Sequence, residues 1–198
     1  MPTYVHILTC GTPSFVTDCF SQAPAFQNDH EGEHGTWTKS KNRFATGAWT
    51  ASLDEDSLVN ALSAGRTFCR ELGASPTLDL AAAGGSLRMG QAAVTNAGSV
   101  VDLQVMADGL PQGSVVRVVQ GAIEPGTVEL DPSSMTVHTL TADSFASGTS
   151  TVLMDNSRSS FARVEVMDVT GRCIAFSNPI WLLVDSAPTP VPLARTPK

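Results

Sequence analysis

The stretch Val100–Gly109, VVDLQVMADG, decides the fold because apolar and polar residues alternate along it. In an extended chain successive side chains point to opposite faces, so Val101, Leu103 and Val105 share one face and polar residues share the other. Such alternation is typical of a strand that packs one face on a core and leaves the other in water. The stretch therefore predicts a strand of an antiparallel sheet.

The same alternation recurs through the second half of the chain. The runs are SVVRVVQG (114–121), GTVELDP (126–132), MTVHTLTA (135–142), STVLMDN (150–156) and FARVEVMDVTG (161–171). Clusters of Gly, Pro, Asp, Asn and Ser separate them as turns. The pattern predicts a mainly β fold, an antiparallel Ig-like β-sandwich over residues 76–185. His138 is expected to be structural, and residues 174–184 are expected to form a strand buried on both faces or a docking strand.

A helix is predicted to link this sandwich to the first part of the chain, over residues 53–75. Ser52 and Glu55 have the spacing of a capping box, and the acids at 54–56 suit the positive end of the helix dipole. Gly65 is expected to end the regular helix, and TFCREL (67–72) to continue as a strand or a loose turn. The apolar stripe of the helix is Leu58, Ala61, Leu62 and Gly65.

Residues 1–52 are predicted to be a short αβ segment followed by a long polar loop. TYVHILTCG (3–11) has the spacing of the last turns of a helix, and TPSFVTD (12–18) is expected to be a short strand that ends in Asp18. This order matches one αβ unit of a (β/α) barrel, where ligand-binding residues gather at strand ends. The Pro-rich tail at 186–198 is expected to be extended and flexible.

Composition limits the classes of partner. The 198 residues are 42% hydrophobic and 16% charged, and the net charge is −7. Nucleic acids and anionic membranes need a clustered basic patch, so neither is expected as a partner. No apolar run reaches the roughly 18 residues of a membrane helix. The start of the chain does not have the pattern of a signal peptide, and the four cysteines are scattered, which together predict free thiols in the cytoplasm. Two disulfides in an exported chain are the alternative.

A polar run at residues 28–35, NDHEGEHG, is the main candidate site. His30 and His34 are spaced to share one face of a helix, a common zinc geometry, and Asp29 would complete a donor set. Glu31 or Glu33 would then act as a base. Glycines interrupt the run, so the alternative is a solvated loop without a ligand.

Two basic features are candidates for contact with an anionic substrate. Arg43 belongs to a short basic cluster with Lys39 and Lys41, and its guanidinium suits phosphate or carboxylate. Arg66 follows the predicted helix. The alternatives are a solvated loop for Arg43, and for Arg66 a role in capping its helix or pairing with a nearby acid.

Four stretches carry a resemblance to a known family. They are YVHILTCGTPSFVTDCF (4–20), NRFATGAWTASLDEDSLVNALSAGRTF (42–68), GASPTLDLAAAGGSLRMGQ (73–91) and FARVEVMDVTGRCIAFSNPIWL (161–182). They resemble the C-terminal portion of the PHP (polymerase and histidinol phosphatase) superfamily of metal-dependent hydrolases, closest to its CehA/McbA-like branch. In that branch an Ig-like sandwich follows a distorted (β/α)7 barrel. The resemblance therefore implies a barrel remnant before the sandwich.

The resemblance also implies a function. Asp18 matches a late metal ligand of the family, whose clustered divalent metals (Zn, Mn or Fe) activate a water that attacks a phosphoester. The chain has no H-x-H pair, its histidines are His6, His30, His34 and His138, and Phe20 stands where many relatives have His. Most of the family's ligands are thus absent, and no catalytic residue is assigned.

Three hypotheses for function follow. The first is a C-terminal fragment or split part of a PHP-type phosphoesterase-like hydrolase, inactive alone, whose uncovered apolar faces bind a missing barrel segment or a second copy. The second is a non-catalytic sandwich that binds a protein or carbohydrate. The third is a small metal-binding protein that uses residues 28–35.

Overall fold

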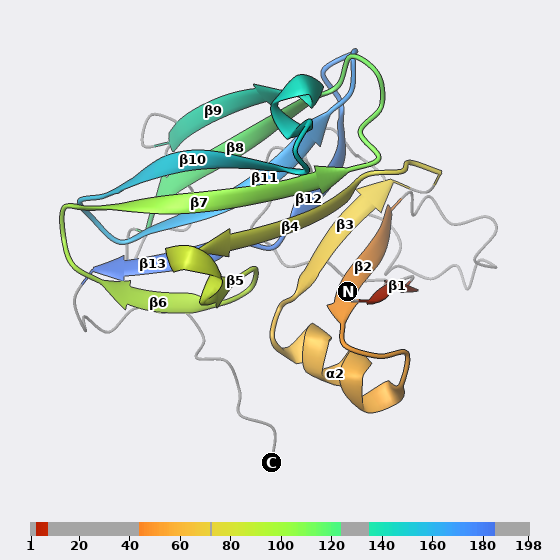
Figure 1. Cartoon of the computed structure of the whole chain (residues 1–198), viewed down its shortest axis with the longest axis horizontal. Helices are drawn as coiled ribbons and strands as arrows, with labels where there is room; N and C mark the ends of the chain where they lie inside the picture. Colours follow the sequence, from red (N-terminus) through yellow and green to blue (C-terminus); the bar gives the residue numbers. More distant parts are fainter. Residues whose placement is uncertain (1–2, 8–43, 72, 124–134, 185–198) are drawn as a thin grey trace, which may run out of the picture.

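The computed structural model of the chain describes residues 3–7, 44–71, 73–123 and 135–184 (Figure 1). The polar loop, the run at 126–132 and the Pro-rich tail lie outside these residues. The described elements are β1 (Thr3–Ile7), β2 (Phe44–Thr50), α2 (Glu55–Ser63), β3 (Thr67–Glu71), β4 (Thr77–Ala82), η2 (Ala83–Gly85), β5 (Leu87–Arg88), β6 (Ala92–Thr95), β7 (Ser99–Asp108), β8 (Val115–Ala122), β9 (Met135–Thr141), η4 (Ala142–Phe145), β10 (Thr149–Asn156), β11 (Ser160–Met167), β12 (Cys173–Ser177) and β13 (Ile180–Val184).

The described strands form two sheets packed face to face. The larger follows the order β1-β2-β3-β12-β11-β13-β6, with β8 beside β11 and β9 beside β8, and the smaller follows β10-β7-β4-β5. Figure 1 shows β4, β7 and β10 lying over the strands of the larger sheet. All pairs are antiparallel except β13 with β6. The predicted mainly β antiparallel sandwich is confirmed.

The core lies between the two sheets. Leu103 and Val105 of β7 are buried, and Val101 packs against the same cluster from a half-buried position, as the alternation predicts. From the opposite sheet Val118 and Val164 are fully buried. Burying one such side chain contributes about 1.5–3 kcal/mol, so this cluster supplies the main favourable term for the sandwich.

The first strands correct two predictions. Residues 3–7 form strand β1, not a helix, and pair with β2 in register from Thr3 opposite Thr50 to Ile7 opposite Thr46. Every other residue from Thr3 to Ile7 is β-branched, which suits a strand. The sheet also extends beyond the predicted boundary at residue 76, because β3 pairs with β12 through Arg70 opposite Ala175. No barrel remnant is visible among the described residues.

Within the predicted linking segment at 53–75, helix α2 occupies Glu55–Ser63. Its N-cap is Asp54, whose carboxylate accepts the Ser57 amide at 2.8 Å, while the Ser52 hydroxyl donates to Asp54. The predicted capping box of Ser52 and Glu55 is therefore wrong: Asp54, also a strong capping residue, takes that place.

The predicted end of the helix at Gly65 is confirmed. Gly65 has φ +66°, its amide donates to the Leu62 carbonyl at 3.1 Å, and the Arg66 amide donates to the Ala61 carbonyl at 2.9 Å. These are the two bonds of a Schellman motif. Of the predicted apolar stripe only Ala61 is buried and Leu62 is exposed, because among the described elements the helix packs mainly on β2.

The outward face of the larger sheet carries a second apolar cluster. It consists of Phe44, Met167, Cys173 and Phe176, and the rings of Phe44 and Phe176 lie 5.8 Å apart. The β11 residues on this face are buried, so β11 is buried on both faces. The run at residues 174–184, expected to be one strand buried on both faces or a docking strand, forms two strands: β12 is buried throughout, whereas in β13 only Ile180 and Leu182 are buried.

Candidate functional site

The predicted metal and substrate residues fall mostly outside the described part of the chain. Asp18, Asp29, His30, His34 and Arg43 all lie in the undescribed range 8–43. The described ranges contain no group of three or more His, Cys, Asp or Glu side chains placed to hold a metal ion. They therefore supply no donor set for the divalent metal, and its ligands stay a prediction.

Arg66 is the predicted site residue that the structure does describe. It lies just after α2, and its side chain reaches β4, where Nη2 is 3.2 Å from Oδ2 of Asp79. This ion pair is the pairing with a nearby acid that the sequence left as the alternative. A contact between Arg66 and a substrate stays a prediction.

Asp79 is an unusual carboxylate because it is nearly buried on a β-strand. Its side chain is 10% exposed, and that of Arg66 is 25% exposed. Burial raises the pKa of Asp79, while Arg66, the Leu80 amide and Arg88 lower it, and the net shift is upward. Arg66 Nε is buried and has no hydrogen-bond partner among the described residues. Within this part of the chain Asp79 therefore satisfies the guanidinium only in part.

The region around Arg66 is where the helix meets the sandwich, and we call Gly65, Arg66, Asp79, Gly90 and Asn178 the junction. The Asn178 side chain donates to the Gly65 carbonyl at 3.1 Å. The Gly90 amide donates to the carbonyl of residue 179 at 2.9 Å. A Cβ on Gly90 would lie 2.4 Å from the carbonyl oxygen of Gly65. The two backbones therefore touch directly, and only glycine fits at position 90.

A second charged group lies on the outward face of the larger sheet and was not predicted. Arg163 and Glu165 of β11 are 3% and 0% exposed, and Arg163 Nη2 is 2.6 Å from Glu165 Oε1. Arg117 of β8 approaches the other carboxylate oxygen at 3.6 Å. That oxygen, Oε2, accepts no hydrogen bond from the residues that the structure describes. The only sequence signal was the alternation of Arg163 and Glu165 with valines, which normally indicates a solvent-facing side.

The cysteines correct one prediction. Cys173 takes part in a disulfide whose partner lies outside the described residues, so the prediction of free thiols is wrong for Cys173. Cys69 is free, and burial raises the pKa of its thiol although the Thr46 hydroxyl, 3.8 Å away, lowers it. Disulfides are typical of oxidising compartments. The cytoplasmic location stays a prediction.

Comparison with known proteins finds no family model that matches the chain and no curated protein similar to it. Among the described residues no helix has the length and apolar character needed to cross a bilayer.

Proposed function

We propose that this chain is the C-terminal part of a PHP-type metal-dependent phosphoesterase-like hydrolase and has no turnover alone. Its described part acts as the sandwich that is fixed to a catalytic segment. In the complete enzyme Asp18 is one late ligand to a divalent metal, whose chemistry is to activate water toward a phosphoester.

One observation carries this proposal: three of the four stretches that resemble the family meet at the junction. Gly65 and Arg66 come from the second stretch, Asp79 and Gly90 from the third, and Asn178 from the fourth. The fourth stretch is far from the other two in sequence, yet all three form one set of contacts between α2 and the sandwich. A family that keeps this contact surface has a structural reason to share these residues. A chance resemblance gives no reason for the matching stretches to meet.

The surface of α2 supports a missing partner. Leu53, Val59 and Leu62 are 72%, 51% and 41% exposed. Grouped apolar side chains on a surface are typical of interaction sites. We propose that this face binds the catalytic segment and, when that is absent, a second copy of the chain.

Light scattering tests the surface of α2. We expect the protein to exceed the monomer mass at high concentration, and a Val59→Lys/Leu62→Lys variant to be monomeric. Val169→Lys is the matched control, because Val169 is 73% exposed on a turn away from the helix, and it should behave as the wild type. A wild type that stays monomeric at every concentration would contradict the proposal.

A hydrolysis assay tests the enzymatic part. The purified chain, supplied in turn with Zn²⁺, Mn²⁺ and Fe²⁺, is incubated with bis(p-nitrophenyl) phosphate, beside Asp18→Ala and a His30→Ala/His34→Ala double variant. We expect no turnover by any of the three. Turnover lost in the histidine variant would overturn the proposal in favour of an independent metal site at residues 28–35.

Sequencing the DNA upstream of the coding region separates the proposal from a non-catalytic binding module. A reading frame or continuous sequence that encodes an H-x-H pair supports the proposal. A complete gene with no such sequence nearby would favour the sandwich as a module that binds a protein or a carbohydrate.

A further inference from the structure

A pocket of about 210 Å³ lies at the end of the sandwich away from the junction. It opens between the larger sheet, at β8, β9 and β11, and the turn that joins β10 to β11. Its polar lining is Gln120, Thr136, Asp155, Ser157, Arg158 and Ser160. Because a cavity holds one water once roughly 10–15 Å³ is open to it, this pocket has room for a small polar molecule.

The inward face of the larger sheet changes from apolar to polar at this pocket. Along β8, Val116 and Val118 are fully buried in the core, and Gln120 follows on the same face. Gln120 pairs across the sheet with Thr136 of β9. Gln120 is buried and hydrogen-bonded, as a buried polar side chain requires, whereas Thr136 is exposed. Polar groups therefore line the pocket from its buried side to its exposed side.

Gln120 is held in one orientation with its acceptor left available. It is 9% exposed, and its amide nitrogen donates to the Asp155 carbonyl and, at 3.2 Å, to the Ser160 hydroxyl. Both amide hydrogens are then used. The carbonyl oxygen Oε1 accepts no hydrogen bond from the described part of the chain and can accept one from a ligand hydroxyl.

Arg158 supplies an unpaired cation at the same pocket. It is exposed, and it forms no ion pair or hydrogen bond with any described residue. The nearby Asp155 carboxylate is instead held by the amide and hydroxyl of Ser157, at 3.0 and 3.2 Å. A guanidinium binds a carboxylate with two parallel hydrogen bonds. The lining holds one anion, Asp155, and one cation, Arg158, so a ligand carboxylate has Arg158 as its partner in this pocket.

We propose that the pocket binds a small hydroxylated carboxylate, a molecule of the size and chemistry of a sugar acid or a hydroxy acid. Arg158 pairs with its carboxylate. Gln120 Oε1 accepts from one of its hydroxyls, and the Thr136 hydroxyl bonds to another. This site is independent of the function proposed above, because it shares no residue with the junction.

Heteronuclear NMR titration of the full chain tests the site with D-glucuronate, L-malate and citrate. At least one of them should give saturable shifts confined to residues around the pocket. D-glucose has hydroxyls without charge and acetate has charge without hydroxyls, so each should bind at least tenfold more weakly. Inorganic phosphate should also bind more weakly, and equal affinity for phosphate would overturn the assignment to carboxylates.

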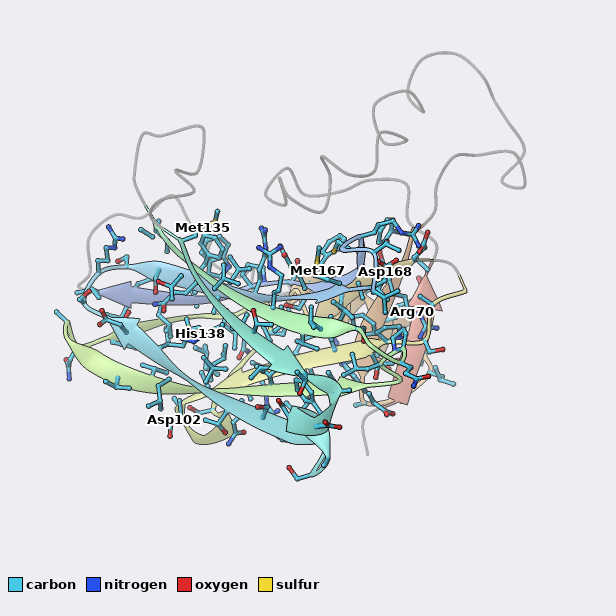
Figure 2. All side chains as sticks on the ribbon, turned by 90° about the horizontal axis from the view of Figure 1, so that it is seen from above. Arg70, Asp102, Met135, His138, Met167 and Asp168 are labelled. Atoms are coloured by element: carbon cyan, nitrogen blue, oxygen red, sulfur yellow. The ribbon has the colours of Figure 1, made fainter. Side chains whose placement is uncertain are left out.

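Two variants and a matched control complete the test. Arg158→Gln alters an exposed side chain and should weaken binding at least tenfold, and Thr136→Val should weaken it several-fold. Arg70→Gln removes the same charge at the other end of the molecule (Figure 2) and should leave binding within twofold of the wild type. Absence of saturable binding by all three acids would overturn the proposal. So would equal weakening by Arg158→Gln and Arg70→Gln, which would indicate a general charge effect.

Discussion

Gly90 offers the sharpest test of how the helix is attached to the sandwich. It has φ +84°, a conformation that L side chains rarely adopt. An added Cβ would lie 2.4 Å from the Ala64 carbonyl oxygen and from the carbonyl carbon and oxygen of Gly65, whereas ordinary contact begins near 3.4 Å. We therefore expect Gly90→Ala to destabilise the protein by two separate effects.

The cost can be worked out from these two effects. The left-handed backbone costs an alanine about 1–2 kcal/mol. Forcing a methyl group about 1 Å into a packed backbone costs roughly 1–3 kcal/mol more. The expected total is about 2–5 kcal/mol, a large part of the ~5–15 kcal/mol that stabilises a typical domain.

Gly148→Ala is the matched control. Gly148 has φ +81°, nearly the same as Gly90, but nothing lies within 4 Å of its added Cβ. It should lose only the backbone part, about 1–2 kcal/mol. The difference between the two variants therefore isolates the close approach of residue 90 to the helix end.

Urea unfolding followed by tryptophan fluorescence measures both variants. The Trp49 amide donates to the Arg66 carbonyl and the Trp181 amide to the Gln91 carbonyl, both at 2.9 Å, so the emission of these two side chains reports on the region of the junction. The midpoint should fall more for Gly90→Ala, with the slope m unchanged. Equal losses in the two variants would refute the reasoning, because the contact would then add nothing to the backbone strain.

Three further predictions follow from the charged groups. The hydrogen bond from the Thr170 hydroxyl is the largest of the effects that lower the pKa of Asp168 to about 2. The ionised Asp168 carboxylate should therefore contribute fully to stability above its unfolded pKa near 4, and this contribution should be lost as the pH falls through 2. NMR titration of the Asp168 carboxyl carbon measures this pKa. Arg66→Gln should cost about 2 kcal/mol in urea unfolding, more than Asp79→Asn, because it removes the ion pair of a nearly buried carboxylate. The difference in cost between the two variants should shrink when acid protonates Asp79, whose pKa is raised. A larger cost for Asp79→Asn would contradict this order. Glu165→Ala should cost about 1–3 kcal/mol by thermal or urea unfolding, because it removes the buried 2.6 Å ion pair with Arg163. An unchanged free energy of unfolding would contradict this prediction.

The parts of the fold that depend on local pattern could be predicted from the sequence. Alternation placed Leu103 and Val105 in the core. Gly65 was predicted as the helix end because a helix end that needs positive φ favours glycine. Residues 3–7 were assigned wrongly because a five-residue segment is compatible with either period. Its pairing with β2, some forty residues away, decides the outcome, and no local pattern contains that information.

The candidate sites depended on long-range packing and were harder to find. An acid partner for Arg66 was foreseen, but only the sheet register shows that it is Asp79. Arg163 and Glu165 have the alternation of a solvent-facing side, yet both are buried. The pocket joins Gln120, Thr136 and Arg158, which are far apart in sequence and meet only because β8 lies between β9 and β11.

The position of β3 beside β12 has a consequence for synthesis on the ribosome. Arg70 of β3 pairs with Ala175 of β12, so β3 is synthesised roughly a hundred residues before the strand that pairs with it. At translation rates of about 5–20 residues per second, this delay is roughly 5–20 s. During that time the core around Phe68, which ends at 1% exposure, still lacks the side chains of Val164 and Ile174. The nascent chain therefore presents an unpaired strand edge and an aromatic side chain to its surroundings, and chaperone binding in this interval should favour residues 44–71.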